Sequence, residues 1–184
     1  MRVVIIGSGG REHSMCLALK KSKNISKIYC IPGNAGTGEI SENIELDISN
    51  FNKLYEFIIN NKVETVIIGP EKPLVAGIED FLTKKKINVF GPNKVASQLE
   101  GSKIFTKELC KKYNIPTANF GVFENFDNAK NFLKECNYPI VVKADGLAAG
   151  KGVYICENKD KSISAVEEIF NGKFGLAKNV LIEE

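Results

Sequence analysis

Short apolar runs and longer amphipathic segments alternate along the first 92 residues. Each apolar run is too short for a helix and ends at glycine or proline, which is typical of strands buried on both faces of a parallel sheet. The segments between these runs carry apolar residues at helical spacing, most clearly at 51–61. The pattern predicts strands at 3–6, 27–31, 65–68 and 89–90, and helices at 11–21, 51–61 and 74–82.

Strands that alternate with helices through right-handed crossovers form an open, Rossmann-like parallel sheet. Ligands bind such sheets beyond the carboxyl ends of the strands. Turn-rich segments follow the predicted strands at 7–11, 32–36, 69–74 and 91–92. The sequence therefore predicts an α/β fold whose ligand site is built from these segments.

The alternation of apolar runs with amphipathic segments changes after residue 101. Ser102 is a typical N-cap for a helix that the pattern extends to residue 113, before Pro116 interrupts it. Two later apolar runs are separated by a glycine-rich loop rather than by a helix, which indicates antiparallel pairing. The pattern predicts strands at 119–123, 140–143, 153–156 and 180–182, and helices at 126–136 and 162–170. We predict a first domain at 1–101 and an α+β domain at 102–184.

The chain ends on an apolar strand, Val180-Leu181-Ile182, followed by Glu183-Glu184. Natural termini are mostly polar and frayed. We therefore expect the 184 residues to be a fragment of a longer protein, with the second domain truncated.

Composition excludes several classes of protein. A hydrophobic fraction of 43% and a charged fraction of 26% are those of a globular chain and exclude wholesale disorder. The net charge of +3 is spread evenly, so it predicts neither nucleic acid nor an anionic membrane as a partner. No apolar run approaches the roughly 20 residues of a membrane span, and the first is too short for a signal peptide. We expect a cytoplasmic protein.

The cysteines predict free thiols rather than disulfides. Their number is odd, they form no C-x-x-C pair, and most lie in apolar runs. Buried thiols in a reducing compartment are the simplest interpretation of that pattern. The five positions are Cys16, Cys30, Cys110, Cys136 and Cys156.

The motif Gly-Ser-Gly-Gly-Arg-Glu-His at 7–13 follows a predicted strand and opens a helix. Glycines let the backbone approach a ligand, and N–H groups at a helix start favour anions. A dinucleotide site would read G-x-G-x-x-G, but Glu12 stands at the third glycine and no acidic residue ends the second strand. Arg11, one of only two arginines, favours a phosphate site over a plain structural turn. His13, the only histidine, is more typical of a structural or phosphate-orienting residue than of a general base.

The segment Lys-Ala-Asp-Gly-Leu-Ala-Ala-Gly-Lys-Gly-Val at 143–153 is the strongest local signal. Lys143 ends an apolar strand, where a cation is costly unless it meets a partner. The loop of small residues after it can cover phosphates with backbone N–H groups. It is not a Walker A loop, because the glycine spacing differs and Lys151 is followed by Gly152 rather than by Ser or Thr. A flexible hairpin is the alternative.

Four further motifs stand in order with these two. They are Pro-Gly-Asn-Ala-Gly-Thr at 32–37, Gly-Pro-Glu-Lys-Pro-Leu at 69–74, Leu-Glu-Gly-Ser-Lys at 99–103 and Ile-Pro-Thr at 115–117. Together the six closely resemble the phosphoribosylamine–glycine ligase (glycinamide ribonucleotide synthetase) family, ATP-grasp enzymes of purine biosynthesis. The resemblance covers the whole chain, and several motifs in register are far more specific than any one of them.

That resemblance implies a Rossmann-like, pre-ATP-grasp domain that binds phosphoribosylamine, followed by the first part of an α+β ATP-grasp domain. The phosphoribosylamine contacts it implies are Gly9, Gly10, Arg11, Glu12, Gly33, Asn34, Gly36, Pro70 and Glu71. The ATP contacts it implies are Lys103, Lys143, Gly146, Gly150, Lys151, Gly152, Glu183 and Glu184.

The implied substrates are ATP, glycine and phosphoribosylamine. ATP phosphorylates the carboxylate of glycine, and the amine of phosphoribosylamine attacks the acyl phosphate, while lysines and Mg²⁺ or Mn²⁺ neutralise the transferred charge. The family carries its metal ligands beyond the strand at 180–182. We therefore expect no metal ligand and no certain catalytic residue in this segment, structural roles for Asp145 and Glu157, and no activity from the segment alone.

Three other functions remain open on the residues. Another ATP-grasp ligase would share the fold and a glycine loop, but we would not expect both glycine motifs together. A nicotinamide-dependent oxidoreductase is disfavoured by Glu12 and by the missing acidic residue after the second strand. A non-catalytic module that binds a phosphosugar or a nucleotide is the third.

Overall fold

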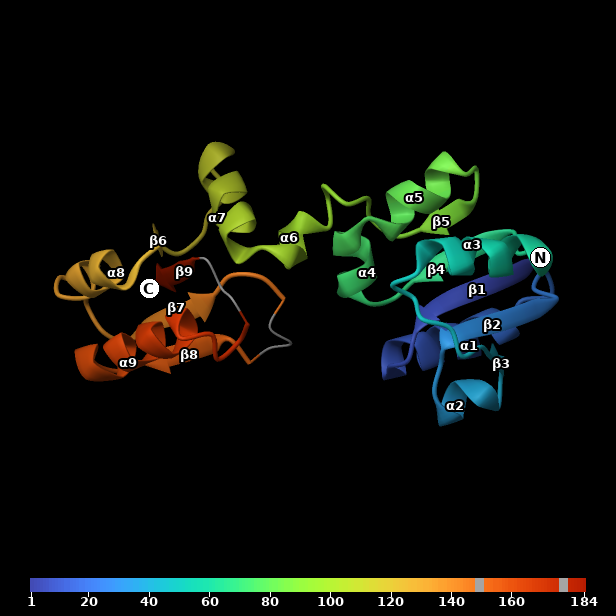
Figure 1. Cartoon of the computed structure of the whole chain (residues 1–184), viewed down its shortest axis with the longest axis horizontal. Helices are drawn as coiled ribbons and strands as arrows, with labels where there is room; N and C mark the ends of the chain where they lie inside the picture. Colours follow the sequence, from blue (N-terminus) through green and yellow to red (C-terminus); the bar gives the residue numbers. More distant parts are fainter. Residues whose placement is uncertain (148–150, 176–178) are drawn as a thin grey trace. The chain divides into compact units, whose positions relative to one another are not determined.

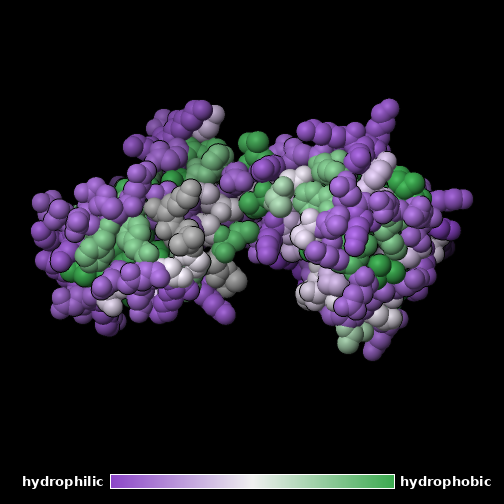
Figure 2. Space-filling model, in the orientation of Figure 1, coloured by the Kyte–Doolittle hydropathy of each residue, from purple (hydrophilic) through white to green (hydrophobic). Residues whose placement is uncertain are grey.

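A computed structural model describes residues 1–147, 151–175 and 179–184. The chain folds as two compact units, Met1–Ser97 and Gln98–Glu184, each built around its own sheet (Figure 1). The first unit thus ends slightly before the predicted domain boundary at 101. The face drawn in Figure 2 is mostly hydrophilic, with smaller hydrophobic areas between the hydrophilic residues. No helix in the described ranges is both long and apolar enough to cross a membrane.

The strands of the first unit form one sheet in the order β3-β2-β1-β4-β5. Every pair described in it is parallel, which confirms the predicted Rossmann-like sheet. Only the polar, two-residue β3 lacked an apolar run that could predict it. The strands are β1 (Arg2–Gly7), β2 (Lys27–Pro32), β3 (Glu42–Asn43), β4 (Thr65–Ile68) and β5 (Asn88–Phe90).

Helices cover both faces of this sheet. Cys16 of α1 packs with Ile5 and Cys30 on one face. On the other face, Leu54 of α3 and Leu82 of α5 belong to the larger cluster of buried residues. The central strand β1 is therefore buried on both faces, as its unbroken apolar run predicted. The helices are α1 (Gly10–Lys20), α2 (Ala35–Gly38), α3 (Phe51–Asn60), α4 (Glu71–Ala76) and α5 (Ile78–Lys84).

The single helix predicted at 74–82 is wrong. Gly77 adopts φ +96°, a left-handed conformation that ends α4 and starts α5 in a new direction. Its N–H still bonds to the carbonyls of Pro73 and Leu74. The apolar spacing runs through the break, because both helices bury side chains against the same face of the sheet. A glycine in a helical pattern was the only sign of the break.

The second unit holds an antiparallel sheet in the order β6-β9-β7-β8, which confirms the predicted α+β architecture. Two predicted helices have different bounds, because α8 ends before 136 and Asn158 caps α9 before 162. The strands are β6 (Phe120–Phe123), β7 (Ile140–Ala144), β8 (Val153–Cys156) and β9 (Val180–Glu183). The helices are α6 (Gln98–Gly101), α7 (Lys103–Lys112), α8 (Phe126–Phe132) and α9 (Lys159–Phe170).

Only one face of this second sheet is packed against α8 and α9. Val142 and Ile182 lie opposite each other in the ladder and join the buried cluster beneath those helices. Because side chains alternate along a strand, Lys143 and Glu183 lie on the other face. The alternation in β7 and β9 therefore decides which charged groups share one surface.

Candidate functional site

A pocket lies at the carboxyl ends of β1, β2 and β4. Its volume is about 780 Å³. The sheet runs from β1 to β2 and β3 on one side and to β4 and β5 on the other, so the pocket lies where the strand order reverses, the usual ligand position in such folds. Gly9, Arg11, Glu12 and Pro70 line it, together with an apolar wall. That wall consists of Leu46, Ile48, Phe51, Pro73 and Ala76.

The side chain of Arg11 is held at the edge of this pocket by the segment that follows β4. Its Nη1 donates a hydrogen bond of 2.6 Å to the carbonyl of Gly69, and its Nη2 lies 3.8 Å from Oε2 of Glu71. Two thirds of the Arg11 side chain remain exposed. An exposed ion pair of this kind is weak, so a phosphate can replace Glu71 as the partner of Arg11.

Glu12 is buried, and its carboxylate accepts a hydrogen bond from the backbone of the glycine-rich loop. Its Oε2 accepts the N–H of Gly9 at 2.5 Å, which makes a capping box at the start of α1. A Cβ at Gly69 would lie 1.9 Å from Oε1 of Glu12, and one at Gly7 would lie 2.6 Å from its Cδ. The glycines at the ends of β1 and β4 therefore make room for this carboxylate.

The turn after β2 is tied to the same loop. Asn34 caps α2 through Thr37, and its Nδ2 donates 2.9 Å to the carbonyl of Ser8. A Cβ at Gly36 would lie 2.8 Å from the ring of His13, so that histidine packs against the turn. Five residues expected to contact substrate lie outside the lining of the pocket: Gly10, Gly33, Asn34, Gly36 and Glu71.

In the second unit a buried carboxylate lies between two lysines. Oε1 of Glu183 pairs with Nζ of Lys143, and its Oε2 pairs with Nζ of Lys107. The exposed fraction of the side chain is 6% for Glu183, 11% for Lys107 and 26% for Lys143. Burial lowers the pKa of the Lys107 ammonium. Burial also lowers the pKa of Lys143, and the charges of Lys107 and Lys103 lower it further.

Lys103 fastens the loop after β7 to the start of α7. Its Nζ donates to the carbonyls of Ala144 at 3.0 Å and Gly146 at 2.9 Å. Asp145 accepts hydrogen bonds from Oγ of Ser102 and from the N–H of Ile104. Asp145 thus has a structural role, as expected, and the loop starts from a fixed position.

Three other residues expected to contact ATP are described on either side of this centre, Lys151 and Gly152 before β8 and Glu184 after β9. The N–H of Ala144 donates 2.8 Å to the carbonyl of Gly152, and Lys151 is exposed. Gly150 lies outside the described residues. Glu184 accepts a hydrogen bond of 3.0 Å from Nδ2 of Asn119. A cavity of about 360 Å³ borders both terminal glutamates.

Lys107 was missed by reasoning from the sequence. It lies four residues after Lys103 on α7, so the two side chains share one face of that helix. A helical lysine with an apolar environment was the available signal, but charged residues on helices are usually solvated. Its burial depends on the contact between α7 and the end of β9.

Thiols and carboxylates form no metal site in the part of the chain that the structure describes. Within residues 1–147, 151–175 and 179–184, no three His, Cys, Asp or Glu side chains are grouped so that they could hold a metal ion. All five cysteines are free. Burial raises the pKa of the Cys30 thiol to about 12, so it stays protonated at neutral pH.

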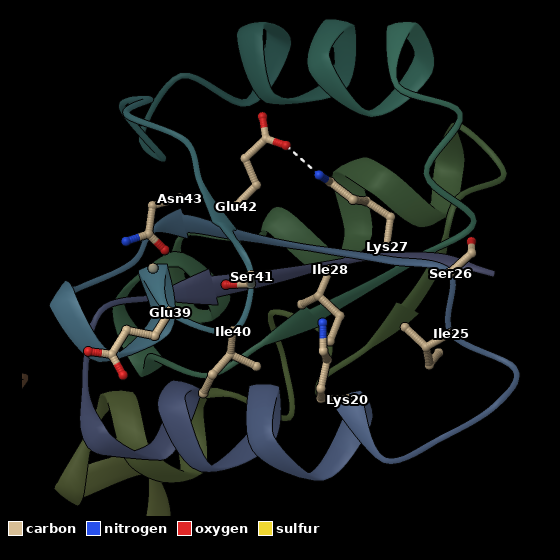
Figure 3. A pocket seen from close by; sticks show the side chains of 11 residues that line it. Lys20, Ile25, Ser26, Lys27, Ile28, Glu39, Ile40, Ser41, Glu42 and Asn43 are labelled. Carbon is tan, nitrogen blue, oxygen red and sulfur yellow. Dashed lines mark ion pairs between the residues drawn. The ribbon is translucent and has the colours of Figure 1, made fainter.

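A second groove, of about 620 Å³, lies at the outer edge of the first sheet (Figure 3). It is lined by the end of α1 and by the residues around β2 and β3. Nζ of Lys27 and Oε2 of Glu42 form an ion pair of 2.6 Å across one side of it. The groove contains none of the residues expected to contact a substrate.

Two family models match the chain end to end. Residues 1–100 match "Phosphoribosylglycinamide synthetase, N domain", and residues 101–184 match "Phosphoribosylglycinamide synthetase, ATP-grasp (A) domain". The phosphoribosylamine–glycine ligases of Clostridium acetobutylicum and Mesorhizobium japonicum are both 46% identical to the chain and cover all of it. The chain spans 45% and 44% of the length of these relatives, less than half.

Solved structures show the same similarity. The phosphoribosylamine–glycine ligase of Thermotoga maritima superposes with a TM-score of 0.80 at 35% identity, over 100% of this chain and 44% of its own. The biotin carboxylase domain of Hydrogenobacter thermophilus 2-oxoglutarate carboxylase, solved with MgADP, has a TM-score of 0.77 over 99% of this chain and 43% of its own. At 21% identity, that likeness shows the fold alone. With both of its units matched in order, the chain belongs to the phosphoribosylglycinamide synthetase family.

Proposed function

We propose that this chain is the N-terminal portion of a phosphoribosylamine–glycine ligase. The whole protein would join glycine to 5-phosphoribosylamine through a glycyl phosphate and release glycinamide ribonucleotide, ADP and phosphate in purine biosynthesis. The observation that carries this proposal is the exposed Arg11 beside the glycine loop, at the pocket where the strand order reverses. We assign 1–101 to phosphoribosylamine binding and 102–184 to the first part of the ATP-grasp domain.

Phosphoribosylamine would bind with its phosphate at the start of α1. Nothing lies within 4 Å of a Cβ position at Gly10, so a phosphate can approach the backbone N–H groups there. Arg11 would supply a charge-assisted hydrogen bond to the phosphate. Asn34 and Glu71 would lie near the sugar and its amine, and the apolar wall would exclude water. Contacts from Gly9, Glu12, Gly33, Gly36 and Pro70 remain predictions.

ATP would bind to the charged face of the second sheet. Lys103 and Lys143 would contact its phosphates, and the loop at 146–152 would cover them. Glu183 and Glu184 would face the adenine from the cavity at the end of β9. The two lysines bring positive charge to a partly buried surface, where an anion gains more than it would in water.

The proposed reaction has two steps. A carboxylate oxygen of glycine attacks the γ-phosphorus of ATP, the bond to the β-phosphate oxygen breaks, and ADP leaves. The amine of phosphoribosylamine then attacks the acyl carbon, phosphate leaves, and the amine loses a proton. Lysines that neutralise the transferred charge would lower the barrier to the first step.

Mg²⁺, or Mn²⁺, would accompany ATP. The described residues offer no cluster of ligands that fits such an ion, so we assign this chain no metal-dependent step. In this proposal the partners are small molecules, with no nucleic acid or membrane, and the protein works in the cytoplasm.

Calorimetric titration with ribose 5-phosphate tests the phosphosugar site. We expect Arg11→Leu to weaken binding about tenfold or more, because a charge-assisted hydrogen bond contributes about 1.5–3 kcal/mol. Arg2→Leu is the matched control, since Arg2 bonds to the carbonyl of Asn61 through its Nη1, away from the pocket. Equal affinity of both variants for ribose 5-phosphate would show that Arg11 does not contribute to phosphosugar binding.

A ligation assay with radiolabelled glycine tests the activity. We expect turnover by the protein at the full length of its relatives and none by the 184 residues alone. Turnover by the 184 residues would contradict the proposal that they are only one portion of the active enzyme.

A further inference from the structure

The two lysines that pair with Glu183, Lys107 on α7 and Lys143 on β7, differ in the number of their contacts. Within residues 1–147, 151–175 and 179–184, the ammonium of Lys143 has only the Glu183 carboxylate as a partner. Lys107 has that carboxylate and two further acceptors, Oγ1 of Thr117 at 2.8 Å and the carbonyl of Ala118 at 3.2 Å. Lys107 is also the more buried of the two. The contacts therefore fix Lys107 in place and leave Lys143 more accessible.

The presence of Lys107 changes the net charge around Lys143. Two ammonium groups and one carboxylate leave the cluster with a net charge of +1. Without Lys107, the carboxylate of Glu183 would neutralise Lys143 alone, and the cluster would carry no net charge. Two unit charges a few ångströms apart near a protein surface interact by a few kcal/mol, so the difference is large enough to decide anion binding.

We propose that Lys107 is a positioning residue, which holds one oxygen of Glu183 so that the ammonium of Lys143 keeps unneutralised charge for a polyphosphate. This inference rests on the proposed function, and it assigns Lys107 no contact with the ligand. Lys107 acts through Glu183, which lies between it and Lys143.

The groups that face Lys143 come from two elements. Lys103 and Lys107 approach it from α7, and Glu183 approaches it from β9. The two α7 lysines disfavour its protonated form, while a carboxylate favours it. Removal of Lys107 should therefore raise the pKa of Lys143, and additional removal of the Glu183 charge should lower it again.

Titration with inorganic tripolyphosphate tests the inference, since this probe has the phosphates of ATP but no base that could contact Glu183. We expect Lys107→Met to weaken tripolyphosphate binding about tenfold. The double variant Lys107→Met/Glu183→Gln should recover most of the loss, because Lys143 is then no longer neutralised. Lys107→Arg should retain most of the affinity, since the charge remains. Lys111→Met, at an exposed position on the same helix, is the matched control and should bind as the unchanged chain does.

Two results would overturn the inference: unchanged affinity in folded Lys107→Met, or a double variant that binds no better than the single one. The second is what a purely structural lysine would give. Thermal unfolding of each variant establishes that it is folded. If Lys107→Met does not fold, Glu183→Gln alone carries the test, and it must bind tripolyphosphate at least as tightly as the unchanged chain.

NMR titration of the lysine Cε signals separates this inference from the proposed function. Failure of the unchanged chain to bind ATP would count against the proposed function and would leave the pKa of Lys143 measurable. We expect that pKa to rise in Lys107→Met and to fall back in the double variant. If the pKa of Lys143 is the same in the unchanged chain and in both variants, the role of Lys107 is contradicted, whether or not ATP binds.

Discussion

Two glutamates, Glu12 and Glu183, have carboxylates in the interior of their units. An isolated buried charge is very unfavourable, so each needs partners from other segments of the chain. Glu12 accepts the N–H of Gly9, and Glu183 pairs with Lys107 and Lys143. The motif at 7–13 predicted a loop in which glycines make room for a ligand. At Gly7, the structure shows that the space is occupied by the chain's own carboxylate.

A double-mutant cycle tests this explanation of the glycines. Gly69→Ala should destabilise the first unit by about 1–3 kcal/mol, because its Cβ would overlap Oε1 of Glu12. Glu12→Ala should cost a similar amount, since it leaves the N–H of Gly9 unsatisfied. Together they should cost less than the sum, with a coupling of about 0.5–3 kcal/mol in urea unfolding.

Strict additivity in that cycle would mean that Gly69 is required for another reason. Glu39→Ala is the matched control for the loss of a carboxylate, because Glu39 is exposed. We expect it to change the unfolding free energy by less than about 0.5 kcal/mol.

At the scale of elements, alternation along strands brings the second site together. Val141 pairs with Glu183, and Lys143 pairs with Leu181, so Lys143 and Glu183 are diagonal neighbours on one face. The apolar run of each strand predicted the strand but not the face that each side chain takes. It could not predict that β9 pairs with β7, because pairing between distant strands depends on the whole sheet.

Gly77 gives the clearest test at this scale. Gly77→Ala should destabilise the first unit by about 1–2 kcal/mol, because φ +96° is unfavourable for a residue with a Cβ. Gly10→Ala is the control, since it lies in a helix with open space at its Cβ position. It should have little effect on the midpoint of urea unfolding. Equal shifts in the two variants would show that the turn between α4 and α5 tolerates a side chain.

At the scale of the whole molecule, the chain has separate hydrophobic cores. Each cluster of buried residues found in the described ranges draws its members from one unit alone. The pattern of apolar runs and amphipathic segments changes after residue 101 because a parallel sheet needs helical crossovers and an antiparallel one does not. Family models divide the chain at residue 100.

Hydrogen exchange tests whether the cores are independent. Leu82→Ala and Leu133→Ala each remove a fully buried side chain, one from each unit, and should each cost about 2–5 kcal/mol. We expect Leu82→Ala to accelerate amide exchange in 1–97 and Leu133→Ala to accelerate it in 98–184. Faster exchange throughout the chain in either variant would show that the two cores unfold as one.

Local patterns in the sequence predicted the two fold classes, the apolar strands, most of the longer helices and the glycine-rich motifs at the strand ends. These features depend on local periodicity, turn residues and short motifs, which neighbouring positions carry. Folding of the whole chain was needed to show that Glu12 fills the loop at 7–13 and that Lys107 shares Glu183 with Lys143. Such contacts join residues far apart in the chain, and burial sets their energy. Burial exists only once the sheets and helices have packed.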